Sequence, residues 1–212
     1  MTQSGITLFV FAKAPIAGKV KTRLLEHCSA ELAAKIAEVL LDTTLSKATK
    51  EWPGPVVLSV GLDASHPVIT QLAQKYSIAV APQASGNLGQ RMQATVDSVA
   101  SRASSSVAIL GADACLVSGN TLRVAYAKLS AGENVIGPSL DGGYYLIGLQ
   151  RSVPKIFANI DWGSEFVFRQ TLQQAKRANV ALASLEPIYD IDTWQDVLLA
   201  AEQIPALAAL LN

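Results

Sequence analysis

The stretch ITLFVFAKAPIAGKVKTRL, from Ile6 to Leu24, decides the fold. Its first seven residues, Ile6 to Ala12, are rich in β-branched and aromatic types. An apolar run this short predicts a strand that is covered on both faces. The apolar character stops at Lys13. The loop that follows contains two backbone breakers and a cluster of cations: Pro15, Gly18, Lys13, Lys19, Lys21 and Arg23.

A buried strand that runs into a glycine-containing, cationic loop and then a helix is a layout that binds phosphates at the crevice of an α/β sheet. The clustering of these cations favours that interpretation, because the 17 basic and 17 acidic residues of the whole chain cancel. The alternative is a solvated surface loop that is merely basic.

The bulk composition limits the class of protein. A length of 212 residues fits one α/β domain, so we expect a single domain over residues 1–212. A hydrophobic share of 50% and a charged share of 16% argue against disorder and are compatible with homo-oligomers. Zero net charge disfavours nucleic acid and anionic membranes as partners and leaves small anionic ligands.

The cysteines and the apolar runs indicate the cellular compartment of the protein. Cys28 and Cys115 provide neither a disulfide framework nor the spacing of metal ligands. The chain shows no signal-peptide pattern and no apolar window long enough for a membrane span. We therefore expect a reduced, cytoplasmic protein.

Hydrophobic runs and breakers predict alternating strands and helices. We expect strands near residues 6–12, 56–60, 78–80, 107–110, 135–136, 144–149 and 180–185. We expect helices near residues 30–50, 68–76, 89–103, 119–129 and 165–178, and a last one from residue 194 that Pro205 kinks or ends. This alternation indicates a mostly parallel sheet covered on both faces.

Polar residues that directly follow strands are candidates for chemistry, because ligands of such sheets bind beyond the carboxyl ends of the strands. Asp113 follows the apolar run 107–110. A carboxylate opposite a cationic loop is suited to Mg²⁺ or Mn²⁺, which take few protein carboxylates and complete their shell with phosphate oxygens and water. The alternative is an aspartate that only turns a loop.

Two further acidic motifs have a structural and a functional interpretation. In Asp190-Ile191-Asp192-Thr193, either Asp192 or Thr193 is suited to cap the last helix, and Asp192 with Gln195 fits a capping box. Capping does not exclude metal binding by Asp192. The segment Asp141-Gly142-Gly143 brings a carboxylate to a backbone that a ligand can approach closely, or it is only a hairpin turn.

These segments together resemble a family. FAKAP-x-x-GKVKTRL, GNLGQRM, G-x-D after a strand, GPSLDGGYYLIGL and DIDT are similar in sequence and order to small bacterial proteins provisionally described as glycosyltransferases of the nucleotide-diphospho-sugar transferase superfamily, the GT-A fold. The KTRL element also resembles phospholactate guanylyltransferases, and DIDT resembles the end of molybdenum-cofactor nucleotidyltransferases. The resemblance spans about residues 6 to 197.

The resemblance implies a three-layer α/β/α domain with a central mixed, mostly parallel sheet. It implies that Asp113 and Asp192 bind Mg²⁺ or Mn²⁺, and that Lys21 and Asp141 are catalytic. Residues implied for phosphate and nucleoside binding are Ala12, Lys13, Gly18, Lys21, Arg23, Gln83, Gly86, Asn87, Leu88 and Arg91. Residues implied for donor or acceptor binding are Asp141, Gly142, Gly143, Trp162 and Ser164.

Two departures from the family pattern concern this site. Cys115 stands where G-x-D-x-P proteins have proline, so a less rigid loop is expected after Asp113. The family's Trp-Ser-Thr is here Trp162-Gly163-Ser164, which affects the acceptor side.

Three functions are compatible with these residues. The first is a metal-dependent glycosyltransferase that uses a nucleoside diphosphate-sugar and a small-molecule acceptor. The second is a nucleotidyltransferase that joins a nucleoside triphosphate to a phosphorylated small molecule and releases pyrophosphate. The third, motivated by the two departures, is a non-catalytic nucleotide-binding module.

Overall fold

A computed structural model describes residues 5–100 and 106–211, so the end of the helix expected over residues 89–103 lies outside the described residues. The strands are β1 (Thr7–Lys13), β2 (Val56–Gly61), β3 (Ala79–Pro82), β4 (Val107–Gly111), β5 (Asn134–Pro138), β6 (Tyr144–Leu149) and β7 (Leu182–Ser184). The helices are η1 (Thr22–Glu26, a 3-10 helix), α1 (Ala30–Glu51), α2 (Pro67–Tyr76), α3 (Leu88–Ala100), α4 (Gly119–Ser130), α5 (Val167–Arg177), α6 (Trp194–Ala201) and α7 (Pro205–Leu211).

The strands form one seven-stranded sheet in the order β3-β2-β1-β4-β6-β5-β7. The opening strand β1 lies in its interior and pairs in parallel with β2 and β4. Among the described strands, β6 alone runs antiparallel to its neighbours β4 and β5. The turn that leads into β6 therefore lies at the edge where β1 and β4 end, which brings the Asp-Gly-Gly segment to the carboxyl edge.

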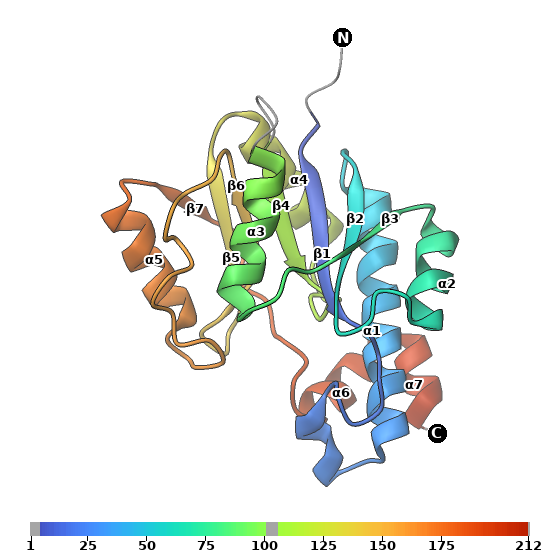
Figure 1. The fold of residues 1–212 in the computed structure, drawn as a ribbon. Coiled ribbons are helices and arrows are strands. Elements are labelled where there is room, and N and C mark those ends of the chain that lie inside the picture. Colours follow the sequence, from blue (N-terminus) through green and yellow to red (C-terminus); the bar gives the residue numbers. More distant parts are fainter. Residues whose placement is uncertain (1–4, 101–105, 212) are drawn as a thin grey trace.

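Side chains of β1 alternate between two helical layers because successive strand residues point to opposite faces. Leu8 and Val10 pack in a cluster with residues of α1, α2 and α4, whereas Phe11 packs in another with residues of α3 and α5. Figure 1 shows α3 in front of the sheet and α1 behind it. The predicted three-layer α/β/α fold with a mostly parallel sheet is confirmed.

A third apolar cluster lies beyond the carboxyl edge of the sheet. It joins the first half of α1 to η1, α6 and α7 through Leu24, Ile36, Val197 and Leu207, and Figure 1 shows α6 and α7 beside α1 below the strands. In addition, the ring of His27 stacks on Trp194 with 5.9 Å between the ring centroids. The segments before η1 and before α6 are therefore held next to each other, although they are far apart in sequence.

Serine side chains cap two of the helices. Ser29 and Ser118 accept hydrogen bonds from the backbone three residues later and begin α1 and α4. The predicted capping box of Asp192 with Gln195 is wrong, because the residue with extended backbone before α6 is Thr193, and its partner is Asp196.

Proline acts differently from the expectation in the last helix. Helix α6 already ends at Ala201, and Pro205 is the first residue of α7. Proline is favoured there because the first turn of a helix needs no N–H donor. The break is thus a turn between two short helices, not a kink.

Candidate functional site

A cavity of about 410 Å³ opens at the carboxyl edge of β1 and β4. The residues that line it and that the sequence had predicted are Ala12, Lys13, Lys21, Arg23, Gln83, Leu88, Arg91, Asp113 and Asp192. Gly18, Gly86 and Asn87, also predicted for nucleotide binding, line neither this cavity nor the second one described below. The cations of the opening loop and the carboxylate that follows β4 therefore face one hollow.

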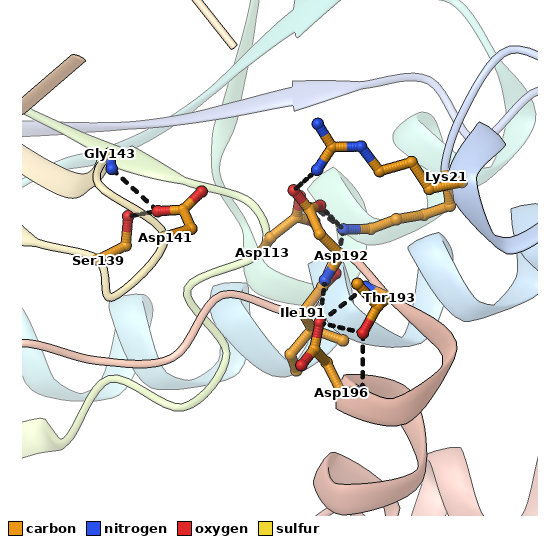
Figure 2. Close-up of polar contacts among 10 residues, drawn as sticks. Lys21, Asp113, Ser139, Asp141, Gly143, Ile191, Asp192, Thr193 and Asp196 are labelled. Carbon is orange, nitrogen blue, oxygen red and sulfur yellow. Dashed lines mark hydrogen bonds and ion pairs between the residues drawn. The ribbon is translucent and has the colours of Figure 1, made fainter. Parts of the chain in front are cut away.

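Lys21 lies between the two predicted metal ligands. Its ammonium is 2.9 Å from Oδ2 of Asp113 and 3.1 Å from Oδ1 of Asp192, and it also donates to the carbonyl oxygen of Ile191. Figure 2 shows the side chain extended toward these groups. Only 6% of the side chain is exposed. The three N–H donors of the ammonium thus all have protein oxygens as partners, here called the three-oxygen cage.

The charges around this cage shift two pKa values. Burial lowers the pKa of Lys21, but the charges of Asp113 and Asp192 outweigh that effect and raise it above the ordinary value, so the ammonium stays charged. Burial, reinforced by Asp113 and Asp192, raises the pKa of Asp190 to about 7. Asp190 therefore keeps its proton to a higher pH than an ordinary aspartate.

On the opposite side of the cavity, the amide of Gln83 positions Arg91. Nε2 of Gln83 donates to the carbonyl oxygens of Ala12 and Ser59, and Oε1 accepts from Nη1 of Arg91 at 2.9 Å. With the amide engaged on both sides, Gln83 orients the guanidinium of Arg91, which lines the cavity.

The glycine-rich segment at the start of α3 also has a structural role. Asn87 and Gln90 cap the helix reciprocally, each side chain accepting from the backbone N–H of the other. A Cβ on Gly89 would lie 2.7 Å from the carbonyl oxygen of Phe157 and 2.8 Å from the ring of Trp162. Gly89 thus permits close packing of the loop that carries Trp162.

A second cavity of about 380 Å³ adjoins the first and shares Phe11, Arg23, Leu88, Gly111 and Asp192 with it. Predicted donor or acceptor residues in its lining are Asp141, Gly143, Trp162 and Ser164. Its charged lining residues are Asp141, Glu165, Asp190 and Asp192 against the single cation Arg23. The first cavity is therefore rich in cations, and the second is acidic and partly aromatic.

The Asp-Gly-Gly segment is both a turn between β5 and β6 and a positioned carboxylate. Oδ1 of Asp141 accepts from the hydroxyl of Ser139 and from the backbone N–H of Gly143, as Figure 2 shows. Gly142, which was predicted for donor or acceptor binding, does not line the cavity. A Cβ there would lie 2.1 Å from the carbonyl oxygen of Glu165, so this glycine is needed for packing.

Helix α1 fixes the loop in which cysteine replaces the family's proline. The hydroxyl of Thr44 donates to the carbonyl oxygen of Ala112 at 2.7 Å, and Lys47 donates to that of Cys115 at 2.6 Å. Burial raises the pKa of the Cys115 thiol to about 12. The thiol is thus inert at neutral pH, and side chains of α1 provide rigidity that proline would provide elsewhere.

The residues present fit a hard divalent cation. Side chains of Asp113 and Asp192 are 40% and 37% exposed, and both direct an oxygen at the same ammonium. Residues 5–100 and 106–211 contain no group of three or more His, Cys, Asp or Glu residues arranged for a metal ion. Two carboxylates still suffice for Mg²⁺ or Mn²⁺ when phosphate oxygens and water supply the other ligands.

Some residues of this site had not been singled out from the sequence. Among them, Phe11 forms part of both cavities, Asp190 is a half-buried acid with a raised pKa, and the carbonyl of Ile191 completes the cage. The D-x-D motif contained a signal for Asp190, and strand alternation placed Phe11 on one face. A backbone carbonyl gives no signal in sequence.

Comparison of the sequence with protein families gives a match over residues 44–164 to a family described as "Uncharacterized protein conserved in bacteria (DUF2064)". The chain belongs to this family. The matched DUF2064 region contains Asp113 and Asp141, whereas Lys21 and Asp192 lie outside it. No curated protein matches the chain.

Solved structures share the fold over nearly the whole DUF2064 chain. A protein of Desulfovibrio desulfuricans G20, provisionally named a nucleotide-diphospho-sugar transferase, is 26% identical with a TM-score of 0.83, over 97% of this chain and 93% of its own. Rv0371C of Mycobacterium tuberculosis H37Rv, solved in complex with manganese, is 20% identical with a TM-score of 0.60, over 94% and 100%.

A cytidylyl-type relative extends the comparison. The 4-diphosphocytidyl-2C-methyl-D-erythritol synthase of Anaerococcus prevotii DSM 20548 is 11% identical with a TM-score of 0.59, over 99% of this chain and 97% of its own. The predicted resemblance to the nucleotide-diphospho-sugar transferase superfamily is therefore confirmed for the fold.

Among the described helices, none is long and apolar enough to cross a membrane.

Proposed function

We propose that this protein is a metal-dependent transferase that uses a nucleoside diphosphate-sugar as donor. The observation that carries the proposal is the division of charge between the two adjoining cavities. The cation-rich cavity suits a diphosphate, and the acidic, partly aromatic cavity suits an uncharged group with many hydroxyls. The similarity to the transferase-type proteins above supports the same class of activity.

The residues of the first cavity have defined tasks in this proposal. Lys13, Arg23 and Arg91 bind the diphosphate through charge-assisted hydrogen bonds. Asp113 and Asp192 hold Mg²⁺ or Mn²⁺. The bound metal would neutralise negative charge on the departing nucleoside diphosphate. Lys21 adds to that stabilisation when its ammonium faces the phosphates.

The second cavity orients the groups that react. Oδ1 of Asp141 is fixed by the turn, so Oδ2 is presented in a defined direction and accepts a hydrogen bond from a hydroxyl of the donor sugar or the acceptor. The ring of Trp162 gives an apolar wall for the sugar face.

The charge of the second cavity separates the proposal from nucleotidyl transfer. A nucleotidyltransferase of the type considered above must bind a phosphorylated acceptor next to the triphosphate. Asp141 and Glu165 make that cavity unfavourable for a second phosphate, because Arg23, its one cationic lining residue, is already paired with Asp192. Glycosyl transfer to a non-phosphorylated acceptor is thus the better fit.

Product analysis with a panel of nucleotide sugars and nucleoside triphosphates, in the presence of Mn²⁺ or Mg²⁺, tests the proposal. We expect release of a nucleoside diphosphate. Release of pyrophosphate would establish the nucleotidyl alternative. Nucleotide binding without turnover, equally strong in Asp113→Asn, would establish a non-catalytic module.

The matched variants are Asp113→Asn and Asp63→Asn. Both aspartates lie just after a strand at the same edge of the sheet, but Asp63 lines neither cavity and its carboxylate accepts from Ser65. We expect the Asp113 variant to lose roughly 100-fold or more in kcat/KM, as for loss of a main electrostatic contact. The Asp63 variant should keep its activity.

A further inference from the structure

The Lys21 ammonium occupies a position with the chemistry of a metal site. Its three partners are two carboxylate oxygens and one carbonyl oxygen, from Asp113, Asp192 and Ile191. Oxygens of these two kinds are the ligands that hard divalent cations prefer. The positive charge of the lysine therefore already fills the three-oxygen cage.

We propose that the Lys21 ammonium and a divalent cation compete for the same three oxygens, so that the metal enters only as the ammonium leaves. This inference rests on the metal site of the proposed function. A metal within coordination distance of Asp113 and Asp192 would lie next to an ammonium that is 2.9 and 3.1 Å from the same carboxylates. Two cations that close repel each other strongly, because both are withdrawn from water.

The backbone at Lys21 is suited to such a movement. Its φ and ψ are 46° and 41°, the left-handed region that a side chain makes unfavourable, and Gly18 three residues earlier has a φ of +72°. Lys21 directly precedes η1, and no side chain caps that helix. The three contacts of the ammonium offset the backbone strain, so their loss favours rotation of the segment between Gly18 and Lys21.

The displaced ammonium has a new partner when a diphosphate is present. In the cage all three of its donors bind protein oxygens, which leaves none for a phosphate. Once released into the first cavity beside Lys13, Arg23 and Arg91, it adds a fourth cation to the phosphate-binding group. Metal and diphosphate should therefore bind cooperatively, each one favouring the rearrangement that the other needs.

Titration with Mn²⁺ alone, followed by electron paramagnetic resonance, tests the competition. Lys21→Met and Lys21→Gln remove the competing charge and should bind Mn²⁺ on the order of 10-fold more tightly than the wild type. Lys19→Met is the matched control: it removes an equal charge from the same loop, but Lys19 is exposed and lies outside the cavity lining. Screening by salt should limit its effect to about twofold or less.

Amine acetylation of the wild-type protein, quantified for each lysine by mass spectrometry, tests the displacement without any variant. Lys21 should react slowly because it is buried and charged, and saturating Mn²⁺ should increase its rate several-fold. Lys19 should react at the same rate with and without Mn²⁺.

The outcomes separate this inference from the proposed function. Suppose that Mn²⁺ binds the wild type and that Asp113→Asn abolishes this binding. If the Lys21 variants then bind Mn²⁺ no more tightly than the wild type, and Mn²⁺ does not speed the acetylation of Lys21, the competition is refuted and the metal-dependent transferase stands. If Mn²⁺ does not bind to any form, both fail. Tighter binding in the Lys21 variants together with metal-induced acetylation of Lys21 supports the competition.

Discussion

Asp190 is half-buried and is one of the four aspartates that line the two cavities. Burial, together with the like charges of Asp113 and Asp192, raises its pKa to about 7, although the charge of Lys21 acts in the opposite direction. In the unfolded chain the pKa of an aspartate is near its ordinary value of 3.8. At this residue the folded protein therefore holds up to one proton more than the unfolded chain between about pH 4 and pH 7.

This difference predicts the pH dependence of stability. Because the folded state holds the extra proton, the free energy of unfolding should fall as pH rises through that window and level off above pH 7. Asp190→Asn should flatten the profile and stabilise the protein at pH 8 by on the order of 1–3 kcal/mol. Urea denaturation at several pH values with EDTA present measures this.

The exposed Glu202→Gln is the control for the Asp190 substitution, because it removes a carboxylate outside both cavity linings. A profile for Asp190→Asn that parallels the wild type would contradict the assigned pKa shift.

At the scale of elements, two glycines with nearly the same backbone conformation differ in their surroundings. Gly142 and Gly132 have φ values of +90° and +87°, so alanine at either position adopts an unfavourable left-handed conformation. A Cβ at Gly142 would also collide with the backbone of Glu165, whereas nothing lies within 4 Å of a Cβ at Gly132.

We therefore expect Gly132→Ala to cost about 1 kcal/mol and Gly142→Ala about 2 kcal/mol or more beyond that, as for forced overpacking. Chemical denaturation gives both values. Equal costs would show that the turn before β6 yields to the added methyl group.

The capping box at α6 gives another element-scale prediction. The Thr193 hydroxyl accepts from the backbone N–H of Asp196, and the Asp196 carboxylate accepts from that of Thr193. Thr193→Ala should lower the free energy of unfolding by about 1 kcal/mol. Thr193→Ser keeps the hydroxyl and should retain most of the stability, so an equal loss in both variants would argue against the cap.

Elements with strong hydrophobic runs were predictable, and short polar ones were not. β1, β4 and β6 are continuous apolar runs whose covered position follows from composition, and α1 has a serine cap. η1 was missed because five residues in a cationic loop carry no periodic pattern. The sequence left the cap of α6 open between Asp192 and Thr193 and placed its capping box one residue too early, because both residues are good N-caps and only the backbone conformation distinguishes them.

The location of the candidate site was predictable from the sequence, but the contacts within it were not. Asp113 and the cations follow apolar strands, so the edge of the sheet where they meet could be inferred from sequence. The engagement of the Lys21 ammonium depends on side-chain contacts across 170 and 171 residues, which no local pattern encodes.

For the molecule as a whole, the contacts between its two ends predict a joint response to ligand. Lys21 and Arg23 contact Asp192, and His27 stacks on Trp194, so the segments around η1 and before α6 share one environment. Binding of Mn²⁺ together with UDP or GDP should slow amide hydrogen exchange in both segments together. Helix α2, which contributes to neither cavity, is the internal reference. Protection of only one segment would show that the two respond independently.

The position of Asp192 along the chain has a consequence for synthesis. A ribosome delivers Lys21 and Asp113 well before Asp192, and all seven described strands, β1 to β7, precede it as well. A nascent chain can thus assemble most of its sheet while the partner that closes the cage is still being translated. Ligand binding that needs both aspartates therefore requires the segment around residue 192 and cannot assist the earlier stages of folding.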